Sequence, residues 1–149
     1  MKKISYLLIF LLLSSCGYES VYNKKNFNTI SIKSYSLDGD KNVNRKLLSL
    51  LDFKKNNFSS YELSLISKKN KQISSKNALG NPLTYKMTLV LNFTIKNLDT
   101  DEIFKTKKFT NSSLYNIIEN NFDFSRYEKE IEENLILKIH EEILIYLNL

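Results

Sequence analysis

The strictest alternation of apolar and polar positions lies in residues 85–95. Every second residue there is apolar, and the residues between are Lys, Thr or Asn except for Val90. Because side chains along a strand point alternately to the two faces of its sheet, this period of two predicts a long strand with one buried face. Turn-forming residues 97–101 then predict a hairpin into a fourth strand, residues 103–110, whose lysines suit the edge of a sheet.

Two weaker alternations predict the remaining strands. Ile30 and Ile32 fall on one face of residues 27–35, which we expect to form the first strand. Residues 61–65 alternate in the same way and are expected to run into a basic loop, residues 68–76. Residues 77–82 contain Gly80 and the only proline, and they are also predicted to be a loop.

Helical spacing occurs twice. After a predicted turn at residues 38–40, Val43, Leu47, Leu50 and Leu51 recur as on one side of a helix, with Asp40 or Asn42 available as its cap. The pattern Ser-Arg-Tyr-Glu at residues 125–128 is typical of a capping box and predicts a second helix from there to about residue 147. Its apolar side comprises Tyr127, Ile131, Leu135, Ile139 and Ile143, and its polar side Glu130, Glu133, Asn134, His140 and Glu141.

The predicted order is β-α-β-β-β-α, an α+β fold. We expect a single domain, residues 27–149, with a four-stranded sheet and two helices on one face. The length allows one core, and with one cysteine in the chain no intramolecular disulfide can stabilise it.

The first residues follow a different pattern. Lys2 and Lys3 precede an apolar run of residues 4–13, which is too short to span a bilayer because that takes ~20 residues. Two serines and the only cysteine, Cys16, follow, as in the lipobox of a bacterial lipoprotein signal peptide. The interpretation is a signal peptide at residues 1–15, acylation of Cys16 and a polar tether at residues 16–26. Gly17 rather than Asp after the cysteine favours the outer membrane, with the domain facing the periplasm. A stray thiol behind an ordinary cleavage site or an uncleaved anchor is the alternative.

Charge is distributed unevenly. The chain carries +6 overall, yet residues 119–149 contain eight acidic and three basic side chains. Residues 16–118 are therefore strongly basic. This asymmetry can orient a protein near an anionic partner. A periplasmic location argues against nucleic acid as that partner.

Residues for catalysis are scarce. His140 is the only histidine and is interpreted as solvated. Adjacent glutamates occur at residues 132–133 and 141–142, but the two members of each pair point in different directions on a helix, so they are also interpreted as solvated. Three glycines cannot build a phosphate loop. We expect no enzyme activity, no metal site and no cofactor.

The basic stretch is the best candidate for ligand binding. Lys68, Lys69, Lys71 and Lys76 lie within nine residues that contain no acid. Their ammonium groups suit the phosphates of a glycolipid and their aliphatic stems suit acyl chains, although a solvated lysine loop is an equal alternative. The edge-strand residues Lys105, Lys107 and Lys108 are weaker candidates.

The layout as a whole resembles the LptE family. The resemblance rests on Cys16-Gly17-Tyr18, the Gly80/Pro82 loop before the long strand, the Ser-Leu-Tyr-Asn segment at residues 113–116 and the C-terminal helix. It implies a protein that plugs and helps assemble an LptD-type β-barrel in the outer membrane and that binds lipopolysaccharide. For the first basic site of that family Lys76 is the nearest match, whereas residues 116–121 offer no base for the second.

Two other functions remain open at the level of sequence. One is an auxiliary scaffold lipoprotein of an ABC-type transport or secretion complex without a glycolipid ligand. The other is a periplasmic hydrolase, for which the chain supplies no nucleophile with a base.

Overall fold

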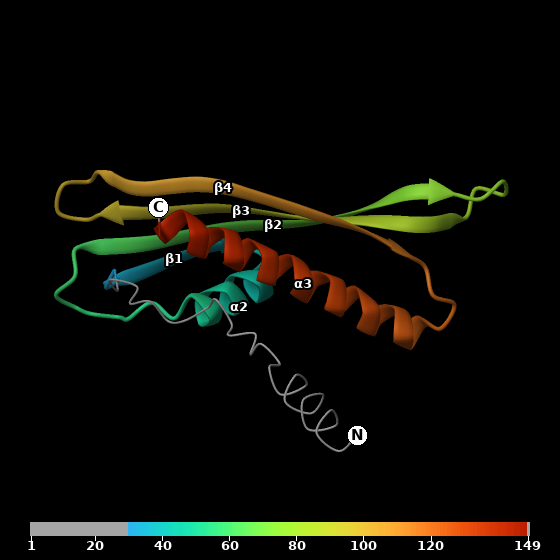
Figure 1. Ribbon diagram of the computed structural model, residues 1–149, viewed down its shortest axis with the longest axis horizontal. Helices are drawn as coiled ribbons and strands as arrows, with labels where there is room; N and C mark the ends of the chain where they lie inside the picture. The colour runs from blue at the N-terminus through green and yellow to red at the C-terminus, as the bar shows by residue number, and fades with distance from the viewer. Residues whose placement is uncertain (1–29, 149) are drawn as a thin grey trace, which may run out of the picture.

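The computed structural model describes residues 30–148. They form, in order, β1 (Ser34–Gly39), α2 (Lys41–Leu51), β2 (Tyr61–Lys76), β3 (Pro82–Asn97), β4 (Ile103–Asn116) and α3 (Asn121–Asn148) (Figure 1). The predicted signal peptide, Cys16 and the tether lie outside the described residues.

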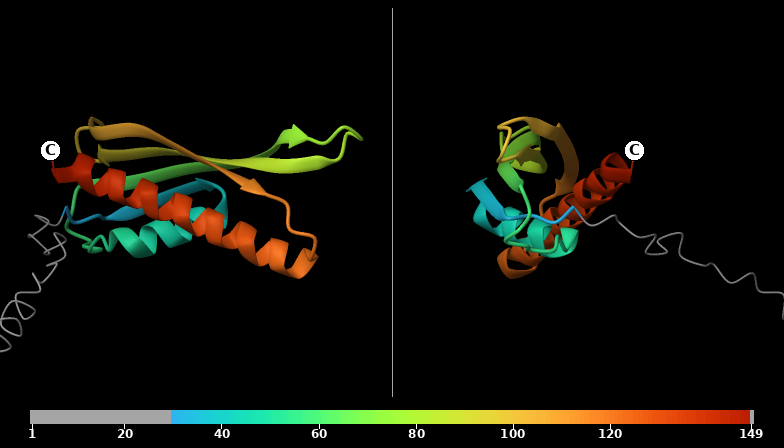
Figure 2. Two further views of the ribbon diagram at one scale, coloured as in Figure 1. Left: turned by 45° about the vertical axis from the view of Figure 1, so that its right-hand side comes forward. Right: turned by 90° about the vertical axis from the view of Figure 1, so that its left-hand side faces the viewer.

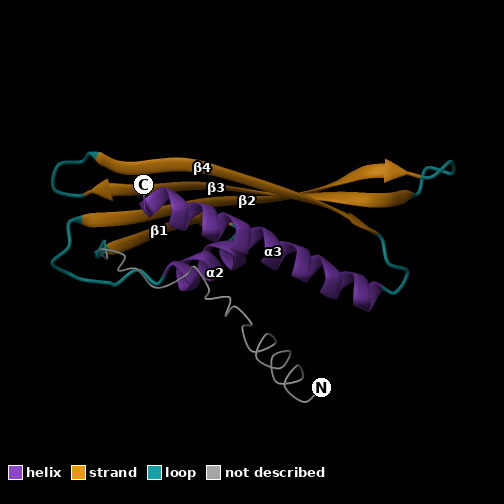
Figure 3. Ribbon diagram, viewed as in Figure 1, coloured by secondary structure: helices purple, strands orange, loops and turns teal. Residues whose placement is uncertain are grey.

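The four strands form one sheet in the order β1-β2-β3-β4 (Figure 3). β1 is parallel to β2, and the other neighbours are antiparallel. Both helices cover the same face, which leaves the other face of the sheet open (Figure 2). The predicted fold class, element order and placement of the helices are confirmed.

The core lies between the sheet and the two helices. β3 contributes alternate residues from Met87 to Ile95, all at most 4% exposed, as its period of two predicted. From α3, Leu135, Ile139 and Ile143 are buried as predicted, while Tyr127 and Ile131 are partly buried against the core. Val43 and Leu47 of α2 complete the contact.

α2 begins where the sequence indicated. The Asp40 carboxylate accepts hydrogen bonds from the backbone N–H groups of Asn42 (3.0 Å) and Val43 (3.1 Å), so Asp40 is the N-cap. The turn expected at residues 38–40 is wrong, because Asp38 and Gly39 are the last residues of β1. Gly39 has a φ of 86°, and a Cβ there would lie 1.8 Å from the carbonyl oxygen of Ser67.

The first strand is displaced from its predicted position. It begins at Ser34 rather than within residues 27–33, of which 27–29 lie outside the described residues. Ile32 is fully buried but forms only an isolated bridge with Lys55. The apolar alternation of Ile30 and Ile32 therefore indicated burial of these side chains and not a strand.

The predicted basic loop is also wrong. Residues 68–76 continue β2, with Lys69 opposite Leu89 and Lys71 opposite Met87 in β3. This segment lacks an apolar alternation of its own, and its backbone is held by hydrogen bonds to the strongly patterned β3. The connection shrinks to residues 77–81, where the Asn77 side chain accepts from the backbone of Leu79 and Asn81.

Two boundaries of the C-terminal half also differ from the predictions. β4 extends to Asn116 rather than residue 110. α3 begins at Asn121, one turn before Ser125, because Asn120 accepts hydrogen bonds from the N–H groups of Phe122 (2.9 Å) and Asp123 (3.3 Å). The capping box is therefore wrong, and the Ser125 hydroxyl instead donates to the carbonyl of Asn121 within the helix.

Candidate functional site

The four candidate lysines do not form one cluster. Because β2 is extended through this segment, adjacent side chains point to opposite faces of the sheet. Lys69 and Lys71 face α3, Lys68 lies on the open face, and Lys76 lies at the end of the strand beside the turn to β3. The four lysines that the sequence predicted to form one basic surface thus lie in three different places.

Lys69 is held between two acids of different elements. Its Nζ lies 2.7 Å from Glu132 of α3 and 3.5 Å from Asp40 at the start of α2. Burial alone would lower the pKa of Lys69, but the hydrogen bond and charge of Glu132 and the charge of Asp40 outweigh it and raise that pKa. Burial would likewise raise the pKa of Asp40, which the bonds from Val43, Lys69 and Asn42 lower instead.

Lys71 is the centre of a second network on the same face. It forms an ion pair with Glu128, and its Nζ lies 4.2 Å from the ring centre of Tyr85 and 5.0 Å from that of Phe124. The Tyr115 hydroxyl donates to Glu128 at 2.6 Å. Burial, followed by that hydrogen bond to Glu128, raises the pKa of Tyr115 far above its ordinary value.

The two networks border a shallow hollow between β2 and α3. It is lined by Lys69, Lys71, Met87, Ser125, Glu128, Lys129 and Glu132. Carboxylates already bind the amines of Lys69 and Lys71, so these two lysines serve mainly to join the strand to the helix. The signal for this pairing was present in the acidic charge of α3, but only the fold assigns the partners.

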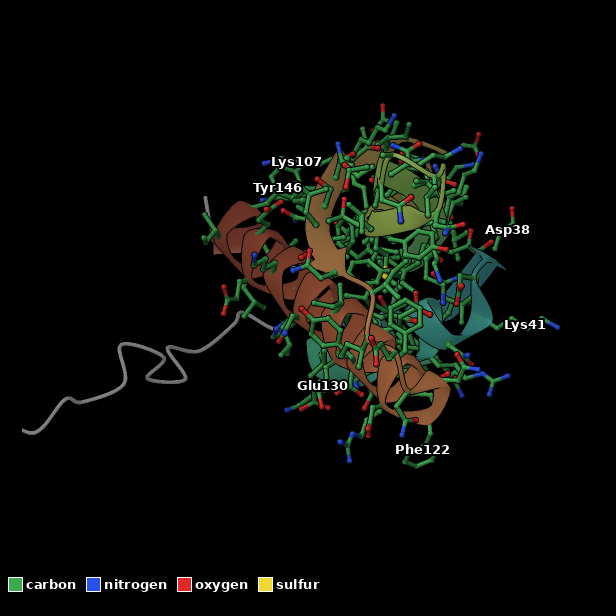
Figure 4. All side chains as sticks on the ribbon, turned by 90° about the vertical axis from the view of Figure 1, so that its right-hand side faces the viewer. Asp38, Lys41, Lys107, Phe122, Glu130 and Tyr146 are labelled. Carbon is green, nitrogen blue, oxygen red and sulfur yellow. The ribbon has the colours of Figure 1, made fainter. Side chains whose placement is uncertain are left out.

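Lys76 belongs to a different environment, which we call the hairpin end. It comprises residues 72–86 of the β2–β3 hairpin and residues 117–122 between β4 and α3, joined by a 3.1 Å bond from the Ile117 N–H to the Leu83 carbonyl. Figure 4 views the molecule from this end and shows Phe122 projecting outward from the start of α3. Lys76 and Lys86 are its lysines. Its exposed apolar side chains lie in two places, Ile73, Leu79 and Leu83 in the hairpin with the lysines and Ile117, Ile118 and Phe122 in the connection to α3.

The hairpin end therefore combines cations with exposed hydrocarbon. The sequence analysis did not single out Lys86, because it lies inside the most regular strand pattern of the chain. It reaches this surface because it is opposite Gln72, on the open face of the sheet.

The lysines of β4 have separate roles. Lys105 Nζ lies 3.1 Å from the carbonyl oxygen of Tyr146 and 3.5 Å from that of Leu147, which places a cation at the C-terminus of α3. Lys107 Nζ lies 5.0 Å from the ring centre of Tyr146, and Figure 4 shows the two side chains next to each other. Lys108 is exposed, opposite Asn92 on the open face. β4 is an edge strand, as predicted.

His140 and Glu132 are less solvated than expected, whereas Glu133 is exposed as predicted. His140 is half-buried beside the backbone of Leu50 in α2, and burial is the main cause of its lowered pKa. The Glu132 side chain is 18% exposed and binds Lys69, and Glu133 binds Lys46 of α2. The helix periodicity identified the polar side of α3 but could not show that α2 and β2 pack against part of it.

The open face of the sheet is mainly polar. Hydroxyl groups pair across its strands, with 3.0 Å between Thr94 Oγ1 and Thr106 Oγ1 and 2.7 Å between Ser75 Oγ and Thr84 Oγ1. Exposed or half-buried Ser, Thr, Asn and Lys residues from β2, β3 and β4 surround them: Ser64, Lys68, Asn70, Thr88, Asn92, Lys108, Thr110 and Ser112. Ile66, at 44% exposed, is one of its few apolar side chains.

Within residues 30–148 no three His, Cys, Asp or Glu side chains converge as a metal site would require. None of the described helices is long and apolar enough to cross a bilayer.

Comparison with known proteins finds relatives by structure only. No protein-family model and no curated protein sequence matches this chain. Rare lipoprotein B from Shewanella oneidensis superposes with a TM-score of 0.57 and 18% identity, over 77% of this chain and 93% of that protein. A minor lipoprotein from Acinetobacter baumannii gives a TM-score of 0.56 and 18% identity, over 76% and 89% of the two chains.

A third solved structure, lipoprotein B from Nitrosomonas europaea, covers 85% of this chain and 88% of its own length, with a TM-score of 0.60 and 9% identity. This chain therefore has the fold of these lipoproteins. Rare lipoprotein B is of the LptE family, so the resemblance inferred from the sequence is confirmed at the level of the fold.

Proposed function

We propose that this chain is an outer-membrane lipoprotein, anchored through Cys16, that plugs and helps assemble an LptD-type β-barrel and assists lipopolysaccharide insertion into the outer leaflet. It acts by binding and not by catalysis. The observation that carries the proposal is the match of the domain to 93% of rare lipoprotein B. The lipobox pattern ending at Cys16 supports the same conclusion independently.

The open face of the sheet supports a barrel as the partner. The interior of a transmembrane β-barrel is polar, so a domain inside it needs hydrogen-bonding groups rather than a large apolar patch. The hydroxyl and amide groups of β2, β3 and β4 meet that requirement over most of the open face. Two helices on the opposite face close the core, so the domain folds without that partner covering its sheet.

The hairpin end supports an anionic amphiphile as the ligand. Lys76 and Lys86 offer ammonium groups for phosphates. Ile73 and Leu83 are exposed in the same hairpin and offer hydrocarbon for acyl chains, Ile73 on the face opposite to Lys86. Lys68 extends this cationic surface along the open face. Lys69 and Lys71 contribute less because Glu132 and Glu128 already neutralise them.

Co-purification tests the proposed partner. The full chain, tagged at its C-terminus, is recovered from detergent-solubilised outer membranes, and a second outer-membrane lipoprotein with the same tag serves as the control. We expect a large outer-membrane β-barrel to be recovered with this chain and not with the control lipoprotein. Recovery of an inner-membrane or periplasmic complex instead would contradict the proposal and favour an auxiliary scaffold of an ABC-type transport or secretion system.

A further inference from the structure

The most exposed large apolar side chain of the described residues lies far from the hairpin end. Phe58 is 96% exposed, in the loop of residues 52–60 between α2 and β2. A turn holds it outward, since the Asn56 side chain accepts from the Phe58 N–H (2.9 Å) and the Asn56 carbonyl accepts from the Ser59 N–H (3.0 Å). The turn thus fixes the backbone that carries this exposed ring.

The described chain begins beside the same loop. The Ile32 N–H donates to the Lys54 carbonyl and the Asn56 N–H donates to the Ile32 carbonyl, each at 2.9 Å. Ile32 itself is fully buried, which fixes this start to the domain. Figure 1 shows the loop at the left end of the molecule, opposite the turn between β2 and β3.

This position places the loop near the predicted anchor. Thirteen residues separate Cys16 from Ile30, and they can reach at most about 45 Å when fully extended. The 16 residues of β2 extend about 50 Å away from the same end, at ~3.3 Å per residue. The tether from Cys16 therefore enters the domain at the loop end and not at the hairpin end.

The charges around Phe58 also suit a bilayer surface. Lys54 and Lys55 are exposed, and neither forms an ion pair within the described part of the chain. An aromatic ring beside lysines matches the boundary between acyl chains and anionic headgroups. The loop also carries one acid, the exposed Asp52, at its start, which leaves it a net charge of +1. The adjacent turn carries Asp99, Asp101 and Glu102, which an anionic surface repels, so the contact is limited to the part of the loop around Phe58, Lys54 and Lys55.

We infer that the loop of residues 52–60 rests on the bilayer that holds the acyl chains of Cys16, with Phe58 inserted at the boundary between headgroups and acyl chains and Lys54 and Lys55 against anionic headgroups. The inference rests on the proposed lipid anchor, but on neither the barrel nor the glycolipid. The loop end is then the part of the domain at the bilayer surface, and the hairpin end is the part farthest from that contact.

Tryptophan fluorescence can test this contact directly, because the chain contains no tryptophan. The full acylated chain with Phe58→Trp is reconstituted into vesicles of phosphatidylethanolamine and phosphatidylglycerol whose acyl chains carry bromine. The matched control is Leu79→Trp, a position 86% exposed at the hairpin end. Both substitutions change fully exposed side chains, so both variants fold.

We expect Phe58→Trp emission to shift to shorter wavelength and to lose intensity against brominated lipid, with Leu79→Trp unchanged. Acylated, vesicle-bound protein whose Phe58→Trp emission is unquenched overturns the contact while leaving the anchor intact. Equal quenching of both variants also overturns it, because the molecule would then lie along the bilayer. Unacylated protein that stays in solution overturns both the contact and the proposed anchor.

Discussion

Lys69 Nζ of β2 lies 2.7 Å from Glu132 Oε2 of α3, across 63 residues of sequence. This pair connects the basic first part of the chain to its acidic last helix. The Lys71–Glu128 and Lys46–Glu133 pairs repeat the connection along the same helix. Three basic side chains are thus neutralised by α3, whereas Lys68, Lys76 and Lys86 of the β2–β3 hairpin form no ion pair within the described residues.

Removing the cation of the Lys69 pair is expected to weaken the domain. Because the Lys69 side chain is only 31% exposed, Lys69→Met should lower the free energy of unfolding by about 1 kcal/mol. Lys68→Met is the control. Lys68 is the next residue in the strand but lies on the open face, so its substitution should change the free energy of unfolding by less than about 0.5 kcal/mol. Urea denaturation measures both, and equal losses would show that the ion pair contributes nothing specific.

Two glycines with the same backbone conformation allow the cost of backbone strain to be measured apart from the cost of a steric clash. Gly39 and Gly80 have φ of 86° and 84°, but a Cβ at Gly80 meets no atom within 4 Å. Gly80→Ala should therefore cost about 1 kcal/mol. Gly39→Ala must also move the Ser67 carbonyl and should cost more than about 3 kcal/mol. Thermal and urea unfolding measure the difference, and similar losses would contradict the close approach of β1 to β2.

The stability of the domain should depend on pH through His140. Because burial lowers its pKa in the folded state, its contribution is complete above the unfolded pKa of about 6.5 and is lost as the pH falls below that value. The free energy of unfolding should thus decrease between about pH 7.5 and pH 5.5. His140→Gln should flatten that decrease, since the chain has no other histidine. An unchanged slope in the variant would assign the titration to another group.

Glycolipid binding should separate the candidate lysines. Replacing Lys68, Lys76 and Lys86 by Ser removes the cations that are free of ion pairs and should weaken lipopolysaccharide binding at least about tenfold, or 1.4 kcal/mol, without lowering the unfolding midpoint. The control replaces three exposed helix lysines, Lys41, Lys129 and Lys138, by Ser and changes the net charge equally. Equal weakening by both sets, measured by binding of fluorescent lipopolysaccharide, would reduce the effect to overall charge.

Membrane attachment should depend on Cys16. Acyl chains contribute ~0.8 kcal/mol per buried CH₂, so two or more of them hold a protein on a bilayer almost permanently. Cys16→Ser should leave the protein unacylated, with an intact fold, and move it out of the outer-membrane fraction. Fractionation followed by mass spectrometry of the N-terminus measures both changes, and unaltered attachment would show that the lipobox interpretation is wrong.

Predictions from local sequence succeeded where the pattern itself was strong. The alternation of residues 85–95 marked β3, and the Asp40 cap marked the start of α2, because both signals depend on residues close together in the chain. The capping box at residues 125–128 failed because another nearby residue, Asn120, caps the helix. The other main failure came where a distant partner decides. Residues 68–76 have no strand pattern of their own, and only pairing with β3 makes them part of β2.

The sequence by itself determined the order of the elements, the buried side of β3 and α3, and the cysteine on which the predicted lipid anchor depends. Only the tertiary structure decided which lysines meet carboxylates and which remain free. The reason is geometric: neighbouring side chains on a strand point to opposite faces, so Lys68 and Lys69 share a sequence but not an environment. One faces open sheet, and the other faces the acidic helix that folding brings against it.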